Sequence, residues 1–267
     1  MKSSSTEAAK KIRELSLRLV HKAKASHIGS ALSIADLLGV MISEPGLCNL
    51  PGPQEPRRDR LLLSKGHACV ALYSALCIKG FFDETELMTY GDDFSPFMNH
   101  ASHYVPGVEI STGALGHALP IACGKALAAR AKKENWHTFV ILSDGEMQEG
   151  SNWEALMFAS HHGLSNLTII IDSNNLQSLT TVEETLSISP LDDKLTSFGW
   201  KVFQVDGHCH EAILRSISDA KESSMPSAVI MHTIKGKGVS FMEGSVEWHY
   251  KSPSNSQLNK AISELYN

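Results

Sequence analysis

The sequence predicts an α/β fold, a doubly wound and mainly parallel sheet flanked by helices. Short continuous runs of mostly apolar residues, at 139–142 and 167–171, are typical of strands that are buried on both faces. Stretches with helical periodicity separate these runs, which indicates right-handed crossovers between parallel strands. A chain of 267 residues with 42% hydrophobic content is long enough to cover both faces of such a sheet.

The elements follow each other without an internal repeat or a linker, so we expect residues 1–267 to form a single domain. A helix capped by Ser5 or Thr6 should run to about Lys24, because apolar residues recur on one of its faces. The run at 60–64 leads into Lys-Gly-His, which predicts a strand, a tight turn and a helix. The remaining predictions are helices at about 117–133, 149–161 and 211–221, strands at 138–142, 167–171, 201–205 and 227–231, and a last helix near 258–265.

Composition argues against several classes of protein. The net charge is -5 and acidic and basic residues are mixed, so we expect no basic face for nucleic acid. No stretch approaches the roughly 18 apolar residues that a membrane span needs, and the first residues lack the apolar core of a signal peptide. The five cysteines include no C-x-x-C pair, which predicts reduced thiols. We therefore expect a cytoplasmic protein with neither nucleic-acid nor membrane partners.

A carboxylate and an amide stand at the ends of two successive predicted strands. Asp144 follows the strand at 138–142, and Asn174 follows the strand at 167–171. Ligands of open parallel sheets bind outside the carboxyl ends of the strands, where these residues would lie. Asp144, the amide oxygen of Asn174 and a backbone carbonyl just beyond it could hold Mg²⁺, and Gly145 would let the backbone approach phosphate groups. Taken alone, Asp-Gly and Asn-Asn are also ordinary turn formers, so the pair by itself leaves that alternative open.

The spacing of these residues resembles the thiamine diphosphate motif of the transketolase family. Ser143-Asp-Gly is followed by 28 residues and then by Asn174-Asn175, where that family usually has Gly-Asp-Gly and then Asn. Other blocks resemble the same family in the same order, and several ordered blocks are more specific than any single motif. These blocks are residues 25–30, 63–67, 105–109, 111–117, 148–150 and 235–239.

The resemblance implies that the chain binds thiamine diphosphate together with a divalent cation, Mg²⁺ or else Ca²⁺ or Mn²⁺. Asp144, Asn174 and the backbone carbonyl of Leu176 match the metal ligands of the family. Gly145 matches the glycine whose amide meets the diphosphate. These residues are therefore expected to form the diphosphate end of the cofactor site.

Four histidines match active-site positions of the family. His67 and His249 match residues that line the diphosphate and the reactive thiazolium, so they are expected to be both cofactor-binding and catalytic. His27 and His100 match catalytic histidines that contact the hydroxyl groups of the sugar substrate. Imidazoles suit these roles because they exchange protons near neutral pH. Around His100 the family's Gly-His-Pro is absent, and His103 is an alternative alignment.

Further positions match the family or depart from it. Gly113 and Leu115 match residues that pack against the aminopyrimidine of the cofactor. Glu149 matches a catalytic and cofactor-binding glutamate in a carboxylate network that links the two active sites of a dimer.

Ser143 replaces a glycine, at little cost if its backbone angles are ordinary. Tyr250 stands where a small residue is usual and could narrow the substrate funnel. The histidines outside the matched blocks are expected to be surface or structural residues: His161, His162, His208 and His210.

The resemblance also implies a partner. Family members carry a second domain that supplies the glutamate for the N1′ nitrogen of the cofactor, and this sequence ends at Asn267, before such a domain. We therefore expect the N-terminal subunit of a split transketolase, a transferase that moves a two-carbon ketol unit from a ketose or ketose phosphate to an aldose. A C-terminal subunit with the pyrimidine-binding and C-terminal domains would complete an α2β2 heterotetramer. Its contact surface is expected near residues 113–120 and 149–162.

Other functions stay open at this point. Deoxyxylulose phosphate synthases and decarboxylating 2-oxo acid dehydrogenases use a similar domain, although residues 148–150 and 235–238 favour the transketolase side. A non-catalytic scaffold relative could keep the fold, but it would have no physical reason to keep Asp144, Asn174 and the histidines together. A dinucleotide loop at 145–150 is excluded, because the glycine spacing is wrong and no acidic ribose partner follows.

Overall fold

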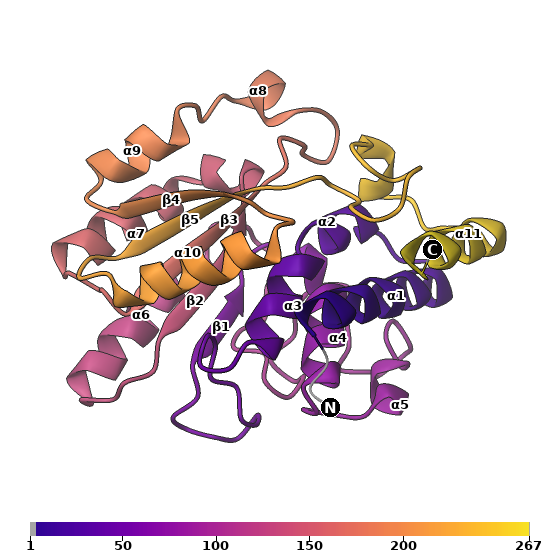
Figure 1. Cartoon of the computed structure of the whole chain (residues 1–267), viewed down its shortest axis with the longest axis horizontal. Coiled ribbons are helices and arrows are strands. Elements are labelled where there is room, and N and C mark those ends of the chain that lie inside the picture. The colour runs from indigo at the N-terminus through magenta and orange to yellow at the C-terminus, as the bar shows by residue number, and fades with distance from the viewer. Residues whose placement is uncertain (1–3, 267) are drawn as a thin grey trace.

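The computed structural model describes residues 4–266 and contains a five-stranded sheet in which all neighbouring strands are parallel (Figure 1). The strand order is β1-β2-β3-β5-β4, so β3 lies in the centre between β2 and β5. The predicted doubly wound sheet is confirmed. Its strands are β1 (Arg60–Leu63), β2 (Thr138–Ser143), β3 (Leu167–Ser173), β4 (Lys201–Asp206) and β5 (Ser227–His232).

Helices cover both faces of the sheet (Figure 1). The first part of the chain forms a helical layer that packs with α10 against one face, and α6 packs against the other face with α7 beside it. The long helices are α1 (Ser5–Ala23), α3 (Ala35–Ser43), α4 (Cys69–Ile78), α6 (Ala118–Ala131), α7 (Gly150–His161), α10 (His210–Glu222) and α11 (Asn255–Tyr266). The shorter helices are α2 (Ile28–Ser33), α5 (Glu84–Leu87), α8 (Val182–Thr185) and α9 (Leu191–Ser197), with 3-10 turns at η1 (Gly66–Ala68), η2 (Gly145–Gln148) and η3 (Val246–His249).

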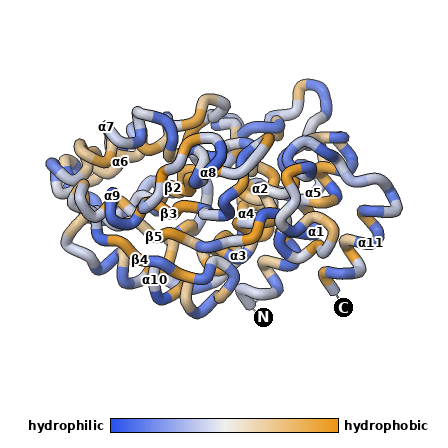
Figure 2. The backbone as a smooth tube through the Cα atoms, turned by 90° about the horizontal axis from the view of Figure 1, so that it is seen from above, coloured by the Kyte–Doolittle hydropathy of each residue, from blue (hydrophilic) through white to orange (hydrophobic). Residues whose placement is uncertain are grey.

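Side chains of the central strands alternate between two hydrophobic clusters. Phe139 and Ile141 of β2 belong to the cluster under α1, α3, α4 and α10, whereas Val140 and Leu142 belong to the cluster under α6 and α7. Both sets are fully buried. This double burial explains why the runs 139–142 and 167–171 are apolar at every position except the buried Thr168. In Figure 2, β3 and β5 are mostly hydrophobic segments inside the molecule.

The predicted strands and long helices are present, with small shifts at their ends. The side chain of Ser4, rather than Ser5 or Thr6, caps α1, since its Oγ accepts a hydrogen bond from the Glu7 amide at 3.2 Å. The predicted strand, turn and helix after residue 60 are β1, η1 and α4. The sequence reading missed α2 and α3. Nearly every residue of both helices is buried, so they lack the polar face that reveals a helix in a sequence.

Two expectations from composition can be compared with the structure. Each of the five cysteines has a free thiol, as their spacing predicted. Within residues 4–266, none of the helices combines the length and the apolar character that crossing a bilayer requires.

Candidate functional site

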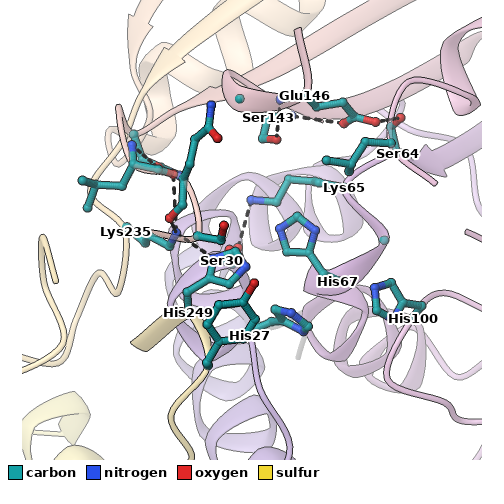
Figure 3. A pocket seen from close by; sticks show the side chains of 18 of the residues that line it. His27, Ser30, Ser64, Lys65, His67, His100, Ser143, Glu146, Lys235 and His249 are labelled. Atoms are coloured by element: carbon teal, nitrogen blue, oxygen red, sulfur yellow. Dashed lines mark hydrogen bonds between the residues drawn. The ribbon is translucent and has the colours of Figure 1, made fainter. Parts of the chain in front are cut away.

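A cavity of about 250 Å³ lies at the carboxyl ends of the strands (Figure 3). Its walls come mainly from segments that directly follow strands: 64–67 after β1, 143–146 after β2 and 174–178 after β3. Parallel strands end at one edge of the sheet, so turns that are far apart in the sequence meet here. The other lining residues are His27, Ser30, His100, Gly113, Leu115, Lys235, His249 and Tyr250.

The four predicted histidines meet in this cavity. The ring centroid of His27 lies 5.2 Å from that of His67, 5.6 Å from that of His100 and 5.0 Å from that of His249. The rings of His67 and His249 are 5.5 Å apart. The structure therefore brings the four side chains together, while their roles in binding and catalysis stay a prediction.

All four imidazoles are neutral near pH 7. Burial, and next the electrostatic influence of the nearby His100 and Lys235, lower the pKa of His27 to about 4. Burial and the neighbouring Lys235 lower the pKa of His249 to about 3. Burial also lowers the pKa of His100, and burial together with Lys65 lowers that of His67 well below its ordinary value. Each ring can therefore both donate and accept a hydrogen bond.

Backbone geometry directs His27 into the cavity wall. His27 precedes α2 with φ of 73°, in the left-handed region that residues other than glycine seldom adopt. Its amide donates to the carbonyl of His249 at 2.6 Å, which ties together two of the four histidines. A strained residue that is held by its surroundings is typical of functional sites.

A buried lysine orients His249. Lys235 Nζ lies 2.9 Å from His249 Nδ1 and 2.8 Å from the carbonyl oxygen of Gln177. An ammonium group only donates, so His249 Nδ1 is the acceptor and its ring carries the proton on Nε2. Burial, reinforced by the charge of Lys65, lowers the pKa of Lys235 to about 8. Lys235 therefore remains mostly charged near pH 7 and places a cation in the cavity wall.

A second buried lysine links the strand ends. Lys65 follows β1, and its Nζ donates to the carbonyl of Ser30 at 3.1 Å and to the carboxylate of Asp172 at the end of β3. Both side chains of this ion pair are almost fully buried. Asp172 in turn accepts a hydrogen bond of 3.0 Å from the side-chain amide of Asn174. The pair thus connects the turn after β1 to one of the expected metal ligands.

The three expected metal ligands lie on the adjacent turns after β2 and β3. The Asp144 carboxylate accepts hydrogen bonds from the amides of Gly145 at 2.8 Å and Asn175 at 2.6 Å. The amide of Leu176 donates to Asn174 Oδ1 at 3.1 Å. Asn174 and Leu176 line the cavity, whereas Asp144 lines a neighbouring cavity. Burial, and next the charge of Asp172, raise the pKa of Asp144 to about 6.

The chemistry of these groups fits a hard divalent cation and a phosphate group. In the part of the chain that the structure describes, no cluster of three or more His, Cys, Asp or Glu side chains could hold a metal, so amide and carbonyl oxygens would have to contribute. A buried carboxylate with a raised pKa gains stability from a nearby cation. At Gly145, an added Cβ would lie 3.0 Å from Gln177 Cγ, so a larger residue would press on a side chain that also lines the cavity.

Glu146 is a buried carboxylate that the sequence reading did not select. Its Oε1 accepts from the Gly116 amide at 2.9 Å and from the hydroxyl of Ser64. The amide of Glu146 donates to Ser143 Oγ at 3.2 Å. Burial raises the pKa of Glu146. Ser143, the departure from the family glycine, ends β2 without a positive φ and is built into this network.

Some predicted residues lie outside the cavity. Glu149 is exposed at the start of α7 and does not line the cavity. Of the two alternative histidines, His100 lines the cavity, whereas His103 is exposed and lies 2.6 Å from Ser111 Oγ. Tyr250 lines the mouth of the cavity with its ring 6.0 Å from His27. Among the remaining histidines, the surface residues are His161 and His162, and the structural ones, which bind Asp36, are His208 and His210.

Several lining residues were not selected from the sequence, although they stand inside the matched blocks. Lys65 and Lys235 are the clearest cases. A lysine next to glycine in the sequence usually indicates an exposed turn, and nothing local shows that these two are buried. Their signal was their place in blocks 63–67 and 235–239, which match the family.

A histidine-lined cavity at the carboxyl ends of parallel strands places the chain in the class of doubly wound α/β domains, whose ligands bind at that edge of the sheet. Comparison with known proteins narrows this class. A family model described as the thiamine diphosphate binding domain of transketolase matches residues 4–263. The chain belongs to the transketolase family.

Two relatives have similar lengths, and both are named as transketolase subunits. The chain is 40% identical over 258 residues to a subunit of the apulose-4-phosphate transketolase of Phocaeicola vulgatus, covering 96% of this chain and 92% of that protein. It is 36% identical over 256 residues to the 6-deoxy-6-sulfo-D-fructose transketolase subunit SqwG of Clostridium sp., covering 95% of this chain and 93% of that protein.

A solved structure confirms the fold. The crystal structure of transketolase from Campylobacter jejuni superposes with a TM-score of 0.92 at 31% identity. It covers 98% of this chain, and the chain spans 42% of that protein. The matched part therefore corresponds to one portion of a larger transketolase.

Proposed function

We propose that the chain is the N-terminal subunit of a two-component transketolase. With a C-terminal partner subunit, it would transfer a two-carbon ketol unit from a ketose or ketose phosphate to an aldose. The observation that carries this proposal is the meeting of four neutral histidines and Lys235 beside Asn174 and the Leu176 carbonyl. In one cavity, this arrangement offers hydrogen-bond donors for a phosphate group, acceptors for protons and hard oxygen ligands for a cation.

The residues divide into a diphosphate end and a sugar end. Asp144, Asn174 and the carbonyl of Leu176 would hold Mg²⁺, or Ca²⁺ or Mn²⁺ in its place. The amide of Gly145 and the charged Lys235 would face the diphosphate, together with His67 and His249. Gly113 and Leu115 also line the cavity, and the aminopyrimidine would pack against them. When bound, thiamine diphosphate supplies the nucleophilic carbon and the electron sink for the two-carbon unit.

The imidazoles of the chain would bind the sugar and move its protons. His27 and His100 lie side by side, as two donors for neighbouring sugar hydroxyls require. Their lowered pKa values leave both rings neutral, so each can accept a hydroxyl proton and return it. His249 keeps its proton on Nε2 because Lys235 occupies Nδ1, which makes Nε2 a fixed donor.

Exposed apolar side chains support a partner interface. Ile121 and Leu127 of α6 and Met157 and Phe158 of α7 are exposed, and these two helices pack against each other. Exposed apolar side chains on two neighbouring helices are typical of a protein contact, and Glu149 precedes one of these helices as the N-cap residue of α7. The naming of two full-length relatives as transketolase subunits supports an α2β2 assembly, which we place in the cytoplasm.

The substrate is proposed at the level of its class. One relative is named for apulose 4-phosphate and the other for 6-deoxy-6-sulfo-D-fructose, a phosphorylated and a sulfonated sugar. We propose a ketose with a free or anionic terminal group as the donor. Tyr250 at the mouth would restrict bulky acceptors.

Reconstitution tests the proposal. The chain is mixed with a candidate C-terminal transketolase subunit from the same organism, and ketol transfer is followed with thiamine diphosphate and Mg²⁺. We expect negligible turnover by the chain alone, activity in the mixture, and no cofactor binding by Asp144→Ala. Substantial turnover without a partner would refute the two-component proposal. Release of CO₂ from a 2-oxo acid would favour a decarboxylating enzyme, and no cofactor binding in any mixture would favour a scaffold.

A further inference from the structure

A buried polar cluster lies outside the cavity, where α1, α3 and the turn before α10 meet (Figure 1). We call Arg13, Asp36, His208 and His210 the Asp36 cluster. Arg13 donates to both carboxylate oxygens of Asp36, at 2.8 and 2.6 Å. His208 Nδ1 lies 2.7 Å from Oδ2 of the same carboxylate, and His210 Nε2 lies 3.1 Å from Oδ1. Burial raises the pKa of Asp36, but the hydrogen bonds and the charge of Arg13 outweigh it, so the pKa lies far below its usual value.

Two members of the cluster also hold the backbone on either side of Lys235. The amide of Ile234 donates to His208 Nε2 at 2.8 Å. Because Nε2 accepts this bond, the neutral ring carries its proton on Nδ1 and donates it to Asp36. Arg13 Nε donates to the carbonyl of Lys237 at 3.0 Å. The Asp36 carboxylate therefore orients His208 and Arg13, whose side chains bind the backbone before and after Lys235.

The segment needs such support. Gly236 and Gly238 have φ of 84° and 94°, so glycine flexibility flanks Lys237 and begins directly after Lys235. A Cβ added to Gly238 would lie 3.1 Å from Arg13 Cδ, which shows how closely Arg13 packs on this segment. Lys235 itself is almost fully buried, and holding its ammonium group in the cavity wall costs desolvation. A free backbone would let the side chain move towards water.

We infer that the Asp36 cluster positions Lys235. Arg13 and His208, both oriented by Asp36, fix residues 234–237 so that the ammonium group stays against the carbonyls of Gln177 and Leu176. These are positioning residues, since none of them lines the cavity. The inference rests on the proposed function only in naming a diphosphate as the anion that Lys235 meets.

The chain offers a matched control. His210 binds the same carboxylate as His208, and the exposed fractions of the two side chains are similar, 19% and 13%. Its other hydrogen bond goes to Ser5 Oγ at 2.9 Å instead of the 234–237 segment. His208→Ala and His210→Ala therefore remove comparable contacts from Asp36, but only the first releases the Ile234 amide. His208→Gln is the conservative variant, because its amide oxygen can still accept from Ile234.

Two measurements on the full chain test the inference. Hydrogen exchange of the peptide covering 233–239 is recorded without any ligand, and the affinity for inorganic pyrophosphate with Mg²⁺ is measured by calorimetry. We expect His208→Ala to speed exchange in this peptide at least fivefold and to weaken pyrophosphate binding about tenfold, the effect of one lost hydrogen bond. His208→Gln should recover most of both. His210→Ala should stay within about twofold of the wild type in both, whatever its melting temperature.

Opposite results would overturn the inference. If His208→Ala and His210→Ala weaken pyrophosphate binding equally and in proportion to their loss of thermal stability, the cluster only stabilises the fold. Unchanged exchange of residues 233–239 in His208→Ala would also refute it. A wild-type chain that does not bind pyrophosphate would contradict the proposed diphosphate site, and the exchange data would then decide the positioning role alone.

Discussion

Replacing Lys65 by methionine tests whether the buried ion pair with Asp172 stabilises the cavity wall. The side chains of the pair are only 1% and 2% exposed, so almost no solvent screens them. The carboxylate also accepts hydrogen bonds from Ser33, Thr233 and Asn174. Removing one partner of a buried pair leaves an uncompensated charge and costs about 3–5 kcal/mol of unfolding free energy. We expect Lys65→Met to lose this amount near neutral pH.

The pH dependence supplies the sign of the effect. Burial raises the pKa of Asp172, but Lys65 and the hydrogen bonds outweigh it and hold the pKa below its ordinary value. In the wild type, this carboxylate therefore contributes stability above about pH 4, the unfolded pKa, and the contribution is lost as the pH falls. Without Lys65, burial is no longer opposed by that charge, and the pKa should rise. The unfolding free energy of Lys65→Met should then fall as the pH rises from about 4 to about 7.

Urea unfolding followed by circular dichroism can measure these differences. Four proteins are compared: the wild type, Lys65→Met, Asp172→Asn and the double variant. The double variant should lose less than Lys65→Met, because it leaves no unpaired charge buried. As a control, Lys11→Met removes a partly exposed pair with Glu14, in which the lysine side chain is 40% exposed, and should cost at most about 1 kcal/mol. A cost of less than about 1 kcal/mol for Lys65→Met, or simple additivity in the double variant, would refute the reasoning.

Three further predictions concern the cavity. Gly145→Ala should weaken thiamine diphosphate binding about tenfold in calorimetry, with little change in melting temperature, because the added Cβ would lie 3.0 Å from Gln177 Cγ. An unchanged affinity would show that the cofactor does not approach the backbone at Gly145. The pKa of Lys235 is about 8, so the affinity for pyrophosphate should fall as the pH rises through about 8. Lys235→Met should remove this step from the pH profile of the affinity, and a step that persists would exclude Lys235 as its source. In the reconstituted complex, His100→Ala should raise the KM for the ketose at least about fivefold and His103→Ala should not; equal effects would contradict the choice of His100.

The fold could be predicted where burial leaves a pattern in the sequence. Residues 139–142 and 167–171 are buried on both faces, and such double burial produces the apolar runs from which β2 and β3 were predicted. The same burial hides α2 and α3, because a helix that is surrounded by other elements has no polar face. The cap of α1 was placed one or two residues too late, since Ser4, Ser5 and Thr6 are all acceptable caps in a sequence.

The candidate site could be predicted only where its residues form local motifs. Asp144 and Asn174 follow strands, and the sequence alone shows that placement. Glu146 is recognised as part of the site only by its contacts with the Gly116 amide and the Ser64 hydroxyl, which are 30 and 82 residues away along the chain. Nothing near Glu146 in the sequence shows that its carboxylate is buried. Long-range partners of this kind escape a reading that depends on spacing.

The buried charges that line the cavity lie beyond the ends of the strands for a physical reason. Within the sheet, the strand ladders satisfy the backbone amides and carbonyls, and apolar side chains can fill the space between the layers. Beyond the last ladder bond, the turns must be buried around a cavity without that pairing, and unpaired polar groups there would be costly. Lys65 binds the Ser30 carbonyl, Lys235 binds the Gln177 carbonyl and Glu146 binds the Gly116 amide. The groups that line the cavity are therefore also the groups that satisfy its turns, so a substitution made to change ligand binding will also change the free energy of the loops that form the site.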